Sequence, residues 1–149
     1  MAEKVTTNTL MKRLFRAVDF DTYLQGNDSY LQPPDFCALL KQYCDQKKML
    51  PAQVIGLSQI ERTYGHQLFN GTRRPSRDKV ILLALGLGLD VDETQQLLRA
   101  AGKSLLYPRL KRDAVILFAV RNRLPVISVQ ETLTKYGLTM LGGQKSGNE

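Results

Sequence analysis

The strongest constraint on the fold is a repeat in the second half of the chain. Residues 77–102 align without a gap to residues 112–137, and 11 of the 26 aligned positions are identical. Each copy has an apolar stretch, a short link and an amphipathic stretch that ends at glycine, Gly102 or Gly137. This length and pattern are typical of a helix hairpin. Two hairpins are too few for a free-standing array, so the rest of the chain is needed as their cap.

Polar residues mark the helix starts within this repeat. Residues 90–93 (DVDE) and residues 128–131 (SVQE) both have the form of a capping box, in which the first and fourth side chains satisfy backbone N–H groups reciprocally. No alternating strand pattern competes with the helical spacing along the chain. The sequence therefore predicts an all-α protein.

The middle of the chain has the outline of a helix-turn-helix. Asp35 is placed as the N-cap of a first helix. A short helix over residues 51–57 follows, with proline at its start, and a break leads to a second short helix over residues 61–69. Asn70 and Gly71 then form a helix stop. Two short helices around a tight turn define the motif.

The amino-terminal segment differs from the rest in charge. Its basic and acidic side chains balance, and its apolar spacing predicts one or two short helices that pack on the main body or on a partner. We expect four parts along the chain. They are an N-terminal helical segment (1–34), a helix-turn-helix core (35–90), a C-terminal helical extension that holds most of the repeat (91–140) and a flexible tail (141–149).

The net charge narrows the class of partner. Lys and Arg number 21 against 14 Asp and Glu, which gives +7 and a pI near 9.6. This sign suits a partner that carries phosphates or an anionic membrane surface. No apolar run approaches 18 residues, and residues 1–9 lack the apolar region of a secretory signal, so we expect a cytoplasmic protein without a membrane span.

Few residues suit metal or catalytic chemistry. His66 is the only histidine, which excludes histidine triads and two-histidine metal motifs. Cys37 and Cys44 lie seven residues apart on one predicted helix, too far apart to pair with each other, and nothing completes a zinc site. We expect no catalytic site, no metal and no cofactor.

Residues 54–76 resemble the helix-turn-helix core of the phage-repressor family, the Cro and lambda-repressor-like or XRE proteins. The likeness is strongest in residues 67–76 (QLFNGTRRPS), and it covers about residues 35–90. Residues 77–137 look like the extension of a small bacterial subgroup, in which an RTYG recognition helix precedes an LYPR linker. The resemblance implies a five-helix, lambda-repressor-like domain that lays its third helix in the major groove of DNA, usually as a homodimer on a palindromic site.

The exposed face of helix 61–69 agrees with this implication. If Ile60 and Leu68 face the core, polar side chains occupy the opposite and lateral faces, where they can address base edges. The candidates for base contacts are Arg62, Thr63, Tyr64 and Gln67. Other polar residues lie where such folds touch the duplex backbone. The candidates for phosphate contacts are Gln53, Asn70, Arg73 and Arg74.

Three positions depart from the family pattern. In the family, the first helix of the motif, here residues 51–57, usually has a small residue at the position of Ile55. The recognition helix, here residues 61–69, usually has an apolar residue at the position of Gly65. Because these sites face each other in the family, we expect Ile55 to fill the space left at Gly65. Gln59 replaces the turn glycine, and we expect it to adopt a left-handed conformation.

Two functions fit these patterns. The first is a non-enzymatic, sequence-specific double-stranded DNA-binding protein, a transcriptional regulator or repressor. The alternative is a protein-interaction module, antitoxin- or adaptor-like, that binds an acidic partner through a basic cluster in residues 99–123. That cluster also fits a larger phosphate footprint or a solvated helix face. The homodimer surface is expected either on the N-terminal helices or on the second repeat. The basic cluster comprises Arg99, Lys103, Arg109, Lys111, Arg112, Arg121 and Arg123.

Overall fold

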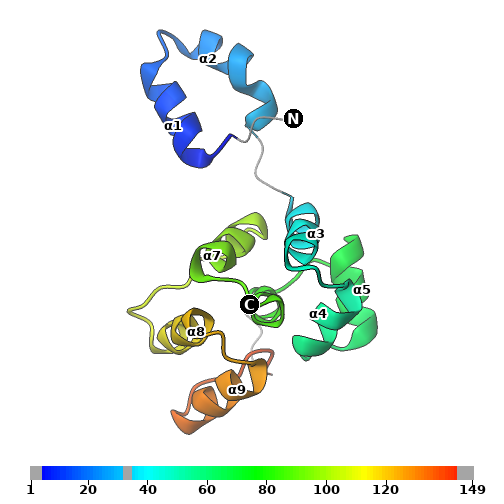
Figure 1. The fold of residues 1–149 in the computed structure, drawn as a ribbon. Helices are drawn as coiled ribbons and strands as arrows, with labels where there is room; N and C mark the ends of the chain where they lie inside the picture. Colours follow the sequence, from blue (N-terminus) through cyan, green and yellow to red (C-terminus); the bar gives the residue numbers. More distant parts are fainter. Residues whose placement is uncertain (1–4, 32–34, 144–149) are drawn as a thin grey trace. The chain divides into compact units, whose positions relative to one another are not determined.

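The computed structural model describes residues 5–31 and 35–143 of the 149-residue chain. Over those two ranges every regular element is a helix, which confirms the predicted all-α class (Figure 1). None of these helices is both long and apolar enough to cross a membrane. The chain divides into two compact units, residues 1–33 and residues 34–149.

The first unit is a small helical hairpin. The Asp19 carboxylate caps its second helix by accepting a hydrogen bond from the Thr22 N–H (2.8 Å), which holds the pKa of Asp19 below its ordinary value. Buried Asn27 links the helices, since its Oδ1 accepts from Nη1 of Arg13 (2.9 Å) and its Nδ2 donates to the Tyr23 carbonyl (2.8 Å). The elements are α1 (Thr7–Arg16), α2 (Phe20–Asn27) and η1 (Asp28–Tyr30).

The second unit begins with three helices whose ends follow local rules. Asp35 caps the first by accepting from the Ala38 N–H (3.0 Å), as predicted. Gly71, with φ of 85°, ends the third at the predicted stop. That helix starts at Arg62, one residue later than predicted, because Glu61 is its N-cap. The elements are α3 (Phe36–Lys47), α4 (Pro51–Leu57) and α5 (Arg62–Asn70).

Four more helices form the two predicted hairpins. At the start of the first hairpin's second helix, Asp90 and Glu93 exchange backbone hydrogen bonds as a capping box, as predicted. The second predicted box is wrong. The repeat places Pro125 at the position of Asp90, so the helix begins at Val126 and Ser128 already lies inside it. The elements are α6 (Arg77–Leu87), α7 (Val91–Ala100), α8 (Lys111–Arg121) and α9 (Val126–Lys135).

The two hairpins are joined by reciprocal ion pairs. Arg77 of the first copy donates to both carboxylate oxygens of Asp113 in the second copy, at 3.1 and 2.9 Å. Arg112 donates in the same way to Asp78, at 3.0 and 2.8 Å. Both aspartates are buried. Because equivalent residues exchange equivalent bonds, the copies are related by an approximate two-fold axis, like the halves of a symmetric dimer.

Both arginines also form hydrogen bonds with the backbone of the segment that follows their own hairpin. Each donates to two backbone carbonyls, and the two sets of carbonyls are again 35 residues apart. Leu141, at the start of the expected tail, is buried and bonded to Gln130, while residues 144–149 of that tail lie outside the described residues. The bonded carbonyls belong to Ser104 and Leu105 for Arg77, and to Thr139 and Met140 for Arg112.

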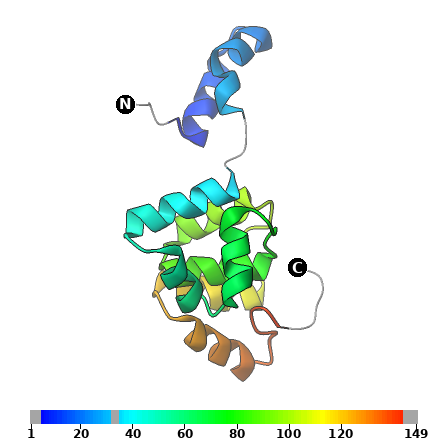
Figure 2. The same ribbon diagram turned by 90° about the vertical axis from the view of Figure 1, so that its right-hand side faces the viewer.

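Helix α6 lies at the centre of the second unit and packs against α3, α4, α7 and α9 (Figure 2). Gly86 permits the close approach of α4, because a Cβ at this position would overlap the side chain of Ser58 and the Val54 carbonyl. Ser58 is fully buried and its hydroxyl donates to that carbonyl (2.7 Å). Helix α4 therefore packs directly on the first hairpin of the repeat.

Candidate nucleic-acid interface

The turn between α4 and α5 sets the position of the candidate recognition helix. Gln59 has φ of 62°, which confirms the predicted left-handed conformation. The next residue, Ile60, is buried, and its N–H donates to the Ile55 carbonyl (3.3 Å). The turn is thus tied back to α4 immediately before α5 begins.

The contact between α4 and α5 depends on a large side chain on α4 that packs against a glycine on α5. A Cβ placed on Gly65 would lie 2.5 Å from Cγ2 of Ile55 and 2.8 Å from its Cγ1, well inside van der Waals contact. Ile55 therefore occupies the space that a side chain at position 65 would need, as predicted. Glycine allows α5 to lie close to α4 despite the larger residue on α4.

The first turn of α5 presents Arg62 and Thr63 to solvent. The Glu61 carboxylate accepts hydrogen bonds from the N–H groups of Thr63 (3.0 Å) and Tyr64 (2.9 Å). These bonds hold the pKa of Glu61 below its ordinary value. A carboxylate therefore already satisfies the N–H groups at this helix start, where an anion such as a phosphate would otherwise bind. Polar contacts between α5 and a ligand must therefore come from the side chains of α5 and not from the backbone N–H groups of its first turn.

The side face of α5 carries a cluster of polar and cationic groups. The guanidinium of Arg73 lies 4.9 Å from the ring centroid of half-buried Tyr64, and the ammonium of Lys79 lies 5.4 Å from the same centroid. Nε of Arg73 donates to Oε1 of Gln67 (2.8 Å). The structure thus joins two base candidates and one phosphate candidate into one group. We call Tyr64, Gln67, Arg73 and Lys79 the Tyr64 cluster.

The other phosphate candidates differ in their local roles. Oε1 of Gln53 accepts from the Leu50 N–H (2.8 Å) at the start of α4. Oδ1 of Asn70 accepts from the N–H (2.9 Å) and the hydroxyl (2.6 Å) of Thr72, which orders the turn after α5. Both amides thus use their oxygen within the protein. Arg74 is exposed beside this turn.

Lys79 is a candidate for phosphate contact that the helix-turn-helix motif does not predict. It lies in the first turn of α6, beyond α5 and the turn that follows it, and its ammonium reaches this surface over the Tyr64 ring. A sequence signal existed, because residues 73–79 carry four cations within seven positions. Exposed His66 lies beside Asn70 at a shallow groove of about 380 Å³, which Leu50, Pro51 and Lys41 also line.

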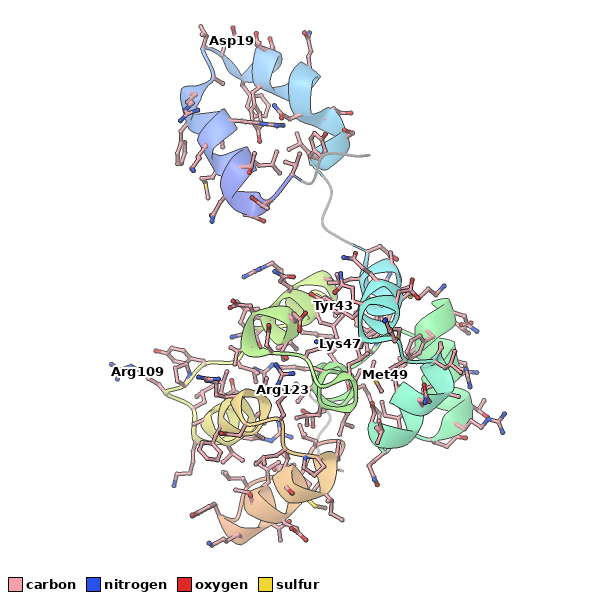
Figure 3. All side chains as sticks on the ribbon, viewed as in Figure 1. Asp19, Tyr43, Lys47, Met49, Arg109 and Arg123 are labelled. Atoms are coloured by element: carbon pink, nitrogen blue, oxygen red, sulfur yellow. The ribbon has the colours of Figure 1, made fainter. Side chains whose placement is uncertain are left out.

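Several cations, including two members of the basic cluster of residues 99–123, have partners within the protein. Arg77 is committed to Asp113 and Arg112 to Asp78. Arg123 reaches the Gly88 carbonyl (2.7 Å). Arg109 instead lies exposed at the outer end of the link between α7 and α8 (Figure 3). The basic cluster of residues 99–123 is therefore smaller as a free surface than its sequence suggests.

Over the described ranges, no group of three or more His, Cys, Asp or Glu side chains is placed to hold a metal ion. Cys37 and Cys44 are free thiols on α3, and burial raises the pKa of both.

Comparisons of the chain with family models, curated proteins and solved structures found no match.

Proposed function

We propose that this protein is a sequence-specific double-stranded DNA-binding regulator that places α5 in the major groove, as the phage-repressor-like motif implies. Arg62 and Thr63 would contact base edges, since their side chains face solvent from the first turn of α5. Tyr64 and Gln67 remain candidates for base contacts, and the cations Arg73, Arg74 and Lys79 would contact the duplex backbone beside them. A homodimer on a palindromic site is part of this proposal.

The observation that carries the proposal is the charge on the outer side of α5. Four cations, Arg62, Arg73, Arg74 and Lys79, lie on this helix and the residues that follow it. Glu61 is the acidic residue beside them, and its carboxylate is bonded to the backbone. Two of the cations are held against Tyr64, which fixes their positions before any ligand binds. Fixed cations beside an exposed helix suit a phosphate backbone flanking a groove.

The experiment is a selection of the purified chain against a random double-stranded DNA pool at near-physiological salt, with enrichment read by sequencing. This salt concentration suppresses the binding that any basic protein shows. A palindromic motif with half-sites about one helical turn apart supports a dimeric regulator. A pool without enrichment, from protein shown to be folded, contradicts the proposal.

The second candidate is a protein-interaction module that binds an acidic partner. The observation that favours it is that Arg99, Arg109, Lys111 and Arg121 are exposed within residues 99–121, away from α5 in sequence. This candidate predicts a tight protein partner and no salt-resistant binding to any duplex.

A further inference from the structure

An apolar groove runs between α8 and α9 of the second hairpin. Its volume is about 480 Å³, within the range of specific binding sites. Phe118 is the most exposed of its apolar side chains, at 66%, and Tyr136 is 56% exposed. Exposed aromatic side chains in the lining of one apolar groove mark an interaction surface. The lining is completed by Lys111, Ala114, Val115, Ala119, Leu124, Val129 and Thr132.

The internal repeat shows what such a groove accepts. The counterparts of Val115, Phe118 and Thr132 in the first hairpin are Val80, Leu83 and Leu97, and each of these is fully buried. Helix α3 packs on both α6 and α7, and α4 packs on α6, so helices cover the first copy of the surface. The second copy lacks such a cover among the described residues. A helix is therefore the shape that this groove fits.

The contacts of α3 also show how a helix is held on this surface. The Tyr43 hydroxyl donates to Oε1 of Gln96 (2.8 Å), and Nζ of Lys47 lies 3.4 Å from Oε1 of Glu93. Both side chains extend from α3 towards α7 (Figure 3). The covering helix thus buries apolar residues and pairs a basic side chain with an acid on the hairpin.

The second hairpin carries different charges from the first at equivalent positions of the repeat. The counterpart of Glu93 is Ser128, and the counterpart of Gly86 is Arg121. Arg121 is exposed one turn after Phe118 on α8, and Lys111 lines the groove itself. Lys135 lies beside the groove residue Tyr136, with 5.5 Å between its ammonium and the ring centroid. A covering helix on this hairpin therefore meets Ser128 in place of Glu93 and the exposed acid Glu131 in place of Gln96. The cations Lys111, Arg121 and Lys135 outnumber this acid around the groove.

We propose that the α8–α9 groove binds an amphipathic helix of a partner protein, with its apolar stripe on Phe118 and Tyr136 and acidic residues beside the stripe. Helix-in-groove recognition supplies the burial, and the exposed cations Lys111, Arg121 and Lys135 select the acidic partner. This site is separate from α5 and does not depend on DNA binding.

The test is a selection with a displayed library of amphipathic helices about 18 residues long, each with apolar residues at helical spacing and a polar face randomised among acidic, basic and neutral residues. The full chain is the bait, and the most enriched peptide is then measured by fluorescence anisotropy. We expect acidic helices to be enriched. Enrichment of basic helices, or of none, overturns the proposal.

Matched variants locate the binding. Phe118→Asp is expected to weaken the selected peptide at least about tenfold, as loss of a central aromatic contact does. Ile127→Asp is the control, because Ile127 is 60% exposed on α9, lies outside the lining of this groove and receives the same charge change. Equal losses in the two variants overturn the proposal. Lys111→Glu, also at an exposed position, serves as a second variant that should weaken the acidic peptide several-fold.

DNA binding is measured on the same variants. Because the second repeat is one of the two surfaces expected for the homodimer, the DNA used is a single half-site, which one copy of the chain can bind. Phe118→Asp should leave binding to this half-site unchanged, so failure of the groove proposal and failure of the DNA proposal give different results.

Discussion

Arg77 and Arg112 lie 35 residues apart and make the same bonds, each to the aspartate that follows the other in sequence. Each pair is bidentate, and the aspartates are only 2–3% exposed at their side chains. The two hairpins are thereby locked together within one chain.

The first prediction concerns these pairs. Asp113→Asn should lower the free energy of unfolding by about 3 kcal/mol, because it leaves the Arg77 guanidinium without a counter-charge in a largely buried site. Asp78→Asn should cost a similar amount, since Arg112 loses the equivalent partner. Chemical denaturation measures both.

Lys47→Gln is the control for charge removal. Its ion pair with Glu93 is more exposed, at 28% and 22%, so the loss should stay within about 1 kcal/mol. Costs for Asp113→Asn that match this control would show that the reciprocal pairs do not lock the hairpins.

Gly65→Ala should destabilise the protein by about 1–3 kcal/mol, although alanine favours helices, because its Cβ would collide with Ile55. The double variant Ile55→Ala, Gly65→Ala should be more stable than the sum of the two single changes predicts. A thermodynamic cycle from thermal or chemical unfolding measures this coupling. Strict additivity would mean that the two residues do not share one space.

Gln59→Gly should stabilise the protein by about 0.5–1 kcal/mol, because glycine adopts the left-handed backbone at this turn without steric cost. Gln42→Gly, at an exposed position within α3, should instead destabilise by about 1 kcal/mol. Opposite signs in the two variants are the expected result. A loss of stability at both positions would contradict the role given to the turn.

The stability of the protein should fall at high pH because of Tyr43. Burial raises the pKa of this phenol to about 12 from an ordinary 10.0, with Glu93 and Asp90 adding to the shift. The contribution is complete below pH 10 and is lost as the pH rises from 10 towards 12, since only the unfolded state gives up the proton there. Tyr43→Phe should flatten this part of the stability curve. Spectroscopic titration of tyrosinate in folded protein should show one group fewer near pH 12 in the variant.

Local signals in the sequence were sufficient for most helix ends and for the α4–α5 contact. Asp35 and Gly71 act within a turn of their own positions, and the exchange between Ile55 and Gly65 involves two neighbouring helices. The ion pair of Arg77 with Asp113 was not predictable in this way, because its partners come together only when both hairpins have formed. The sequence therefore places Arg112 in the basic surface cluster, although it pairs with buried Asp78.

The candidate interface shows the same limit. Exposure of Arg62 and Thr63 followed from helical spacing around Leu68. The cation–π contact of Lys79 with Tyr64 joins the first turn of α6 to α5. The residue spacing within α5 cannot predict this contact. The capping box predicted at Ser128 was wrong. Residues 128–131 match the motif in residue type, but the helix begins at Val126, as in the equivalent helix of the first copy, so Ser128 lies inside it.

If α5 reads DNA, two arginines should differ in their effects on the duplex enriched by selection. Arg62→Ala should cost about 1–3 kcal/mol on that duplex and relax its sequence preference. Arg73→Ala should weaken all duplexes alike and reduce the salt dependence by about one unit of slope. Arg109→Ala, which removes an exposed arginine far along the chain from α5, is the matched control and should change neither quantity.

The most direct test of the account is to map the bound surface by NMR, with isotope-labelled full chain titrated with the enriched duplex. If α5 is the recognition helix, the largest changes in amide chemical shifts fall over residues 61–79, which hold α5, the turn after it and the first turn of α6. Changes confined to α8 and α9, or to the basic residues of 99–123, would contradict the assignment of α5 as the recognition helix.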